Sequence, residues 1–207
     1  QGGSWFTTFR DDAMAVRTET ERLIKAEKQD YRRWQYGGSA GGPIVKDKAH
    51  YFAAFERTQQ DTLQVVSTRG LFPDLDGTFA TPYRETLVTA KVPYAINAKN
   101  FLAIRYGRNQ NSQPYGADPL TPPSGWGESK NTFNSINLNH NWVVGTSVLN
   151  EFIFQYADFA NNISANSKDP TQTFPNGVFI GQNINTPQTT QQKKWQFRDD
   201  FSWYMAG

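Results

Sequence analysis

Apolar and polar side chains alternate along several stretches of this chain, and this alternation constrains the fold more than any other feature. In residues 131–144, Ile136 and Leu138 fall on one side of an extended chain, and Asn137 and Asn139 fall on the other. Successive side chains point to opposite faces of a β-strand, whereas a helix repeats every 3.6 residues. The alternation therefore predicts β structure.

Seven further stretches are strand-like, and their connections follow a second pattern. The stretches are residues 4–10, 34–44, 51–58, 86–92, 99–111, 149–159 and 193–203. Short connections at 45–49, 93–98 and 145–146 alternate with long ones at about 11–33, 61–84, 112–130 and 160–192. We expect an all-β, antiparallel up-and-down meander of about eight strands, with short turns on one rim and long loops on the other.

The polar sides of these strands carry charged and amide groups. The residues concerned are Arg105, Asn137, Asn139, Asn141, Glu151, Gln155 and Arg198. Burying such groups unpaired in a dry core would cost a few kcal/mol each, roughly, whereas a watery lumen costs little. A strand of about 9–11 residues crosses a bilayer. The pattern predicts part of a larger transmembrane β-barrel in which these seven residues face the lumen.

A soluble β-sandwich is the alternative reading of the same alternation. Such a domain would be a carbohydrate-binding or adhesin-like module, with its polar rows exposed to solvent. It would pack the face that carries Phe152 against the face that carries Trp195. A barrel instead presents one continuous apolar face to lipid.

The composition excludes several kinds of chemistry. The chain has no cysteine, so it forms neither disulfides nor thiolate metal sites. His50 and His140 are 90 positions apart and fit no metal-ligand spacing. Neighbouring carboxylates such as Asp199 and Asp200 would face opposite ways in a strand. We therefore expect no catalytic residues, no metal and no cofactor, and the net charge of +2 does not suggest nucleic acid as a partner.

The long connections contain two candidate binding features. Four aromatic residues lie in these connections or at their borders, among Pro, Gly and Asn, and would either bind a ligand, sugars included, or pack the loops together. They are Tyr115, Trp126, Phe174 and Phe179. A short helix is expected within residues 12–30, and its basic end would either be an ordinary solvated surface or attract lipopolysaccharide phosphates. The basic residues are Lys25, Lys28, Arg32 and Arg33.

One stretch resembles a known family. Residues 34–48, WQYGGSAGGPIVKDK, are similar to the Gly-rich stretch of TonB-dependent receptors of the Oar-like type. Weaker resemblances to the same family follow in order along the chain. They are at residues 9–14, 51–60, 139–142, 149–152 and 197–203.

The resemblance implies an outer-membrane barrel of about 22 strands, in a Gram-negative-type bacterium. Residues 1–207 would form roughly the first third of its wall, and the family's carboxypeptidase-regulatory-like and plug domains would lie outside them. The implied function is energised uptake or transport of a large substrate across the outer membrane. The implied partners are outer-membrane lipid and lipopolysaccharide, the protein's own plug domain and, through it, the TonB energising complex.

Overall fold

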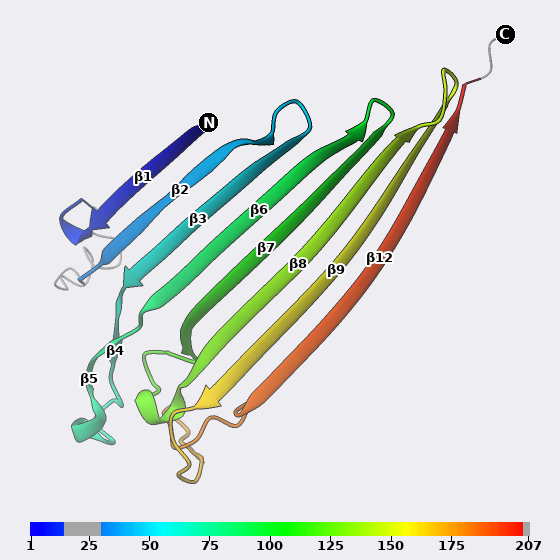
Figure 1. Ribbon diagram of the computed structural model, residues 1–207. Helices are drawn as coiled ribbons and strands as arrows, with labels where there is room; N and C mark the ends of the chain where they lie inside the picture. The colour runs from blue at the N-terminus through cyan, green and yellow to red at the C-terminus, as the bar shows by residue number, and fades with distance from the viewer. Residues whose placement is uncertain (15–29, 205–207) are drawn as a thin grey trace.

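The computed structural model describes residues 1–14 and 30–204. Its main element is one antiparallel sheet of eight strands, which follow one another across the sheet in chain order (Figure 1). The strands are β1 (Gly2–Asp11), β2 (Arg32–Val45), β3 (Ala49–Asp61), β6 (Tyr83–Asn97), β7 (Asn100–Tyr115), β8 (Gly127–Val143), β9 (Val148–Ala165) and β12 (Gln188–Trp203). The predicted all-β meander is confirmed.

The connections segregate to the two ends of the sheet. Short turns join β2 to β3, β6 to β7 and β8 to β9 at one end, and the long connections lie at the other (Figure 1). The long connections contain the hairpins β4–β5 and β10–β11 and three short 3-10 helices. Their bounds are β4 (Leu63–Val66), β5 (Gly77–Ala80), β10 (Gln172–Thr173), β11 (Phe179–Ile180), η1 (Asp12–Met14), η2 (Pro73–Leu75) and η3 (Pro123–Gly125).

Helical structure in the described part of the chain is limited to these short segments. The helix expected within residues 12–30 lies outside the described residues, apart from η1 and residue 30. No helix in the described ranges is long and apolar enough to cross a membrane.

The strand register gathers the apolar side chains on one face of the sheet, which we call the apolar face. Directly paired residues in antiparallel strands point to the same side. One such row runs from β6 to β12. It consists of Val92, Ile104, Leu138, Phe154 and Phe197. Ile104 and Phe197 are 44% and 66% exposed, so this face is uncovered in the described structure.

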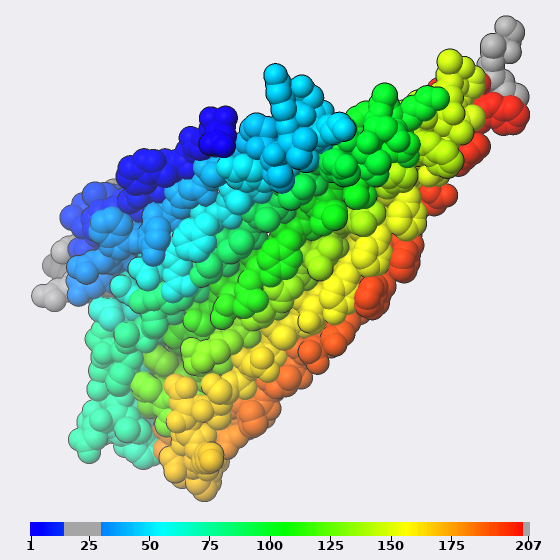
Figure 2. Space-filling view, viewed as in Figure 1, coloured from blue at the N-terminus to red at the C-terminus, as the bar shows by residue number. Residues whose placement is uncertain are grey.

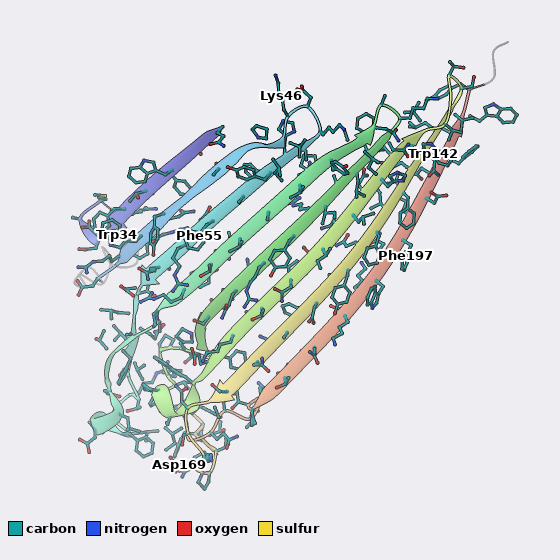
Figure 3. The ribbon with its side chains drawn as sticks, viewed as in Figure 1. Trp34, Lys46, Phe55, Trp142, Asp169 and Phe197 are labelled. Atoms are coloured by element: carbon teal, nitrogen blue, oxygen red, sulfur yellow. The ribbon has the colours of Figure 1, made fainter. Side chains whose placement is uncertain are left out.

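The sandwich alternative fails on the geometry of the same face. The Trp195 ring centroid lies 4.4 Å from that of Tyr156 and 5.8 Å from that of Phe154. All three side chains lie on the same face of neighbouring strands, not on opposed faces of two packed sheets. Side chains of adjacent strands form one continuous wall (Figure 2), along which Phe55 and Phe197 mark β3 and β12 (Figure 3).

Several strands are longer than predicted at the loop end. β9 continues to Ala165, beyond the predicted limit at 159, and β12 begins at Gln188 instead of 193. The additional residues show no alternation, because Asn161 and Asn162 are polar on opposite faces and the apolar Ile163 lies on the same face as Asn161. Their main chains nevertheless remain paired, which extends the sheet beyond its apolar part.

The glycines of β2 permit close approach between strands. A Cβ atom at Gly37 would lie 2.4 Å from the carbonyl oxygen of Phe55 on β3 and 3.1 Å from the Phe6 ring on β1. Phe6 is directly opposite Gly37, so its ring covers the space left by the missing side chain. Such glycine–aromatic pairs allow a sheet to bend without exposing its main chain.

We expect Gly37→Ala to lower the free energy of unfolding by about 1–3 kcal/mol, because the new methyl group clashes with the β3 main chain. Urea titration of the full-length protein refolded into lipid vesicles measures this value. Gly2→Ala is the matched control, since a Cβ there meets no heavy atom within 4 Å. Equal destabilisation by both substitutions would contradict the close-approach account.

Candidate functional site

The second face of the sheet, which we call the polar face, carries all seven residues that alternation predicts to face a lumen. Arg105, Asn137 and Gln155 are directly paired across β7, β8 and β9 and form one row. Lys91 on β6 and Gln196 on β12 extend this row at its two ends. The row is a continuous polar line across five strands.

The other four predicted residues lie closer to the turn end of the same face. Asn141 Nδ2 donates to Asn139 Oδ1 at 2.5 Å, and Asn139 Nδ2 donates to Glu151 Oε1 at 2.8 Å. Arg198 forms an ion pair with Asp200, its neighbour two positions along β12. These groups satisfy one another along and across strands, as polar groups on a water-filled lumen do.

A longer hydrogen-bonded line of side chains, the amide ladder, crosses the polar face near the loop end. Asn161 donates to Asn131 at 2.8 Å, and Asn131 donates to Asn111 at 2.9 Å. Asn111 then donates to Asn109 at 3.1 Å, and Asn109 donates to the Glu85 carboxylate at 2.9 Å. The ladder thus connects β9, β8, β7 and β6 through side chains as well as through the main chain.

Sequence reasoning missed the amide ladder. The available signal was the pair Asn109 and Asn111, which lie two positions apart and therefore share a face. Connecting this pair to Asn131 and Asn161 requires the register of three strands, and no single stretch of sequence contains that information.

Small side chains form a row on the polar face between these two groups across seven strands, from β1 to β9, and Lys194 follows this row on β12. The row consists of Ser4, Ser39, Ala54, Thr89, Gly107, Ser135 and Ala157. Part of it lines a shallow depression of about 280 Å³, flanked by Phe6, Glu56 and Leu87. Because the side chains of this row are short, the polar face is recessed halfway between the turn end and the loop end of the sheet.

Residues Gly37 to Gly41 have the G-x-S-x-G spacing of a nucleophile elbow, in which the serine sits on a sharp turn between a strand and a helix. Ser39 instead lies within the extended strand β2, and its hydroxyl is 2.9 Å from that of Ser4. His50 is on the same face but lies four positions from Ala54, the β3 partner of Ser39. The geometry of an elbow is therefore absent at this motif.

Three of the long loops, at residues 62–82, 116–126 and 166–187, pack against one another and form a small core of their own. Trp126 is 3% exposed, and its indole N–H donates to the carbonyl of Thr121 at 2.6 Å. The Phe79 ring from β5 meets Trp126 edge to face, with 6.0 Å between centroids. Val66 and Val178, from two different loops, are 1% and 0% exposed. The loops therefore form one cap at the loop end of the sheet, where Figure 3 labels Asp169.

The four aromatic residues proposed to bind a ligand have different places in this cap. Trp126 is buried, and Phe174 packs edge to face on Phe72 with 5.2 Å between centroids, so the packing alternative describes both. Phe179 is half-buried against Gly125. Tyr115 is half-buried at the end of β7 on the polar face. A ligand-binding role for Tyr115 and Phe179 stays a prediction.

The basic patch predicted to attract lipopolysaccharide is divided by the fold. Lys25 and Lys28 lie outside the described residues. Arg32 and Arg33 are adjacent in β2, so they point to opposite faces. Arg32 pairs with Asp61 on the apolar face, and Arg33 pairs with Gln60 on the polar face. Of the two described cations, only Arg32 is on the apolar side.

A sharp boundary divides the apolar face into an apolar zone and a polar zone. Tyr106, Tyr156 and Trp195 lie in one row, and the next row toward the loops contains Arg108 and Asn134. The Tyr106 hydroxyl donates to Asn134 Oδ1 at 3.0 Å, and Arg108 donates to the same oxygen at 3.3 Å. Aromatic rings with polar tips at such a boundary are typical of a membrane interface.

The apolar zone has the height of a membrane. From the Trp195 row to the turn end, β12 and β9 each provide nine residues (195–203 and 148–156). Two polar residues of this span, Asn150 and Asp199, also lie on this face near the turn end, and the Asn150 amide donates to the Asp199 carboxylate at 2.8 Å. Trp142 and Trp203 lie at the turn end, so aromatic residues border the zone on both sides (Figure 3). A tilted strand of about 9–11 residues spans the hydrocarbon core. One face of the sheet is thus suited to contact with lipid, and the other is suited to a water-filled lumen.

The fold and its two faces define the wall of a transmembrane β-barrel. The family model described as "Outer membrane beta barrel domain" matches residues 2–79, which contain β1 to β3 and most of the β4–β5 hairpin. No curated protein and no solved structure matches the chain. The chain is part of an outer-membrane β-barrel protein of a Gram-negative-type bacterium.

We expect the β4–β5 loop to loosen in acid. The Thr68 main-chain N–H and hydroxyl donate to Asp76 at 2.5 and 2.7 Å and hold the pKa of that carboxyl below its ordinary value of 3.8. A carboxyl with a lowered folded-state pKa stabilises the fold above its unfolded-state pKa, and this contribution is lost as the pH falls through the folded-state value.

Hydrogen-exchange protection factors of residues 62–82 in the full-length protein measure this effect. Protection should fall as the pH drops below about 3.8 in the wild type. In Asp76→Asn, which lacks the titrating carboxyl, protection should not show this fall. Asp74→Asn, in the same loop, is the control and should behave as the wild type does. An identical pH profile in wild type and Asp76→Asn would contradict the account.

Proposed function

We propose that this chain forms part of the barrel wall of a TonB-dependent receptor that takes up a large substrate across the outer membrane. The proposal involves no catalysis by the chain. The observation that carries it is the polar face, whose line of polar side chains crosses five strands from β6 to β12 and suits a water-filled lumen. The resemblance of residues 34–48 to Oar-like receptors supports the specific class.

The edges of the sheet support a wide barrel. β1 pairs only with β2 and β12 only with β9, so the eight described strands form an open sheet. A closed barrel that contains this sheet needs further strands, and lumen diameter grows with strand number. Eight-stranded barrels are filled by side chains, whereas barrels of about 22 strands hold a plug. A lumen of the larger kind admits a large substrate.

The row of small side chains on the polar face supports a lumen that contains a plug. Ser39, Ala54 and Gly107 extend only slightly from the wall, so another protein body can pack closely there. The proposed partners are this plug domain and, through it, the TonB complex that supplies energy. Outer-membrane lipid contacts the apolar zone, and lipopolysaccharide phosphates meet the cations above it, such as Arg57 and Arg108.

We expect the full-length protein to bind the purified periplasmic domain of TonB and to conduct little current in a planar lipid bilayer. Deletion of the plug should abolish TonB binding and open a conductive pore. Co-purification and single-channel recording measure the two properties. A full-length protein that forms an open pore and does not bind TonB would contradict the proposal.

A further inference from the structure

The polar face around the amide ladder carries no charged side chain on four strands. The ladder region comprises residues 109–115 of β7, 127–133 of β8, 159–165 of β9 and 188–192 of β12. Its side chains on this face are those of Asn109, Asn111, Gln113, Tyr115, Ser129, Asn131, Phe133, Phe159, Asn161, Ile163, Ala165, Gln188, Thr190 and Gln192. Two charged residues border this region, Glu85 at the β6 end of the ladder and Lys194 next to Gln192 on β12. A charged ligand would therefore meet few opposite charges here.

The ladder also retains hydrogen-bonding capacity. An asparagine amide has two donor hydrogens and an acceptor oxygen with two lone pairs. Asn131 and Asn111 each use one hydrogen to continue the ladder and one lone pair to accept from the preceding residue. One donor and one acceptor site on each of these two residues are left for a ligand. Asn161 donates to both Asn131 and Ser129, so its side-chain oxygen is left to accept from a ligand. A hydroxyl group, which both donates and accepts, complements such a rung.

Two aromatic rings adjoin the ladder. Phe133 on β8 and Phe159 on β9 are directly paired, one row farther from the loops than Asn131 and Asn161. Phe133 is 38% exposed, and other rings on the polar face, such as Phe6 and Phe52, are exposed as well, but of these three only Phe133 lies next to the ladder. An exposed ring beside amides offers an apolar surface to a ligand whose edges are polar.

The repeat of the ladder matches a chain of sugars. Neighbouring strands are about 4.8 Å apart, so the rungs Asn161, Asn131 and Asn111, on three successive strands, are separated by about the length of one sugar residue. A neutral sugar has hydroxyl groups at its edge and C–H groups on its face. The hydroxyls suit the amides, and the C–H face suits the phenylalanine rings.

We propose that the ladder residues Asn109, Asn111, Asn131 and Asn161, together with Phe133 and Phe159, bind an uncharged oligosaccharide in the lumen. Neutral glycans are then the substrate class of the uptake proposed above, on which this assignment of a substrate rests. The binding itself requires only the folded barrel.

Calorimetric titration of the full-length protein in detergent tests the site. The probes are maltoheptaose, cellohexaose, xylohexaose and mannohexaose, with hexagalacturonate and a hexalysine peptide as charged comparators. We expect at least one neutral probe to bind and both charged probes to bind more weakly. Asn161→Ala and Phe133→Ala should each weaken binding about tenfold, which corresponds to one lost hydrogen bond or stacking contact.

Asn162→Ala is the matched control, because Asn162 is adjacent to Asn161 but points to the opposite face, and it should leave affinity unchanged. Circular dichroism confirms that each variant is folded. The proposal is overturned if no neutral probe binds the folded protein, if a charged probe binds more tightly, or if Asn161→Ala and Phe133→Ala leave affinity unchanged.

The uptake proposal is tested separately with radiolabelled probe in cells that have or lack TonB. Glycan binding with uptake that does not depend on TonB would overturn the receptor proposal but support the glycan site. TonB-dependent uptake of another substrate, without glycan binding, would support the receptor proposal and overturn the glycan site.

Discussion

Main-chain hydrogen bonding between neighbouring strands is the interaction on which the rest of this structure depends. In lipid there is no water to satisfy a free N–H or C=O group, so a spanning strand must be paired along its length. Each strand of the sheet is paired with its sequence neighbours in an almost unbroken register. Because side chains alternate along a paired strand, this register decides which of them meet lipid and which meet water.

Both surfaces of the wall follow from that register. On the apolar face, the row of Tyr106 and Trp195 lies next to the row of Arg108 and Asn134, which marks the membrane boundary. On the polar face, the same pairing aligns small residues at mid-height and amides near the loops. At the loop end of the sheet, the loops form a core of their own around Trp126. The apolar residues of this cap are buried by one another and not by a second large sheet.

The faces of the strands could be predicted from sequence, because the side on which Arg105 or Asn137 lies depends only on local alternation. The ends of the strands could not, since Asn161 and Asn162 are polar on both faces and only main-chain pairing keeps them in the sheet. The amide ladder depends on register between four strands. The burial of Trp126 depends on Phe79, which is 47 positions away in the chain. Neither the amide ladder nor the burial of Trp126 could therefore be predicted from a local sequence pattern.

The central claim is that alternate residues of one strand face lipid and water, and a chain without cysteine allows a direct measurement. Single cysteines are introduced at Ile136, Asn137, Leu138 and Asn139 in the full-length protein, which is then treated in the outer membrane with a water-soluble maleimide. We predict labelling at Asn137→Cys and Asn139→Cys and little at Ile136→Cys and Leu138→Cys. Equal labelling at all four positions, or the opposite alternation, would contradict the account.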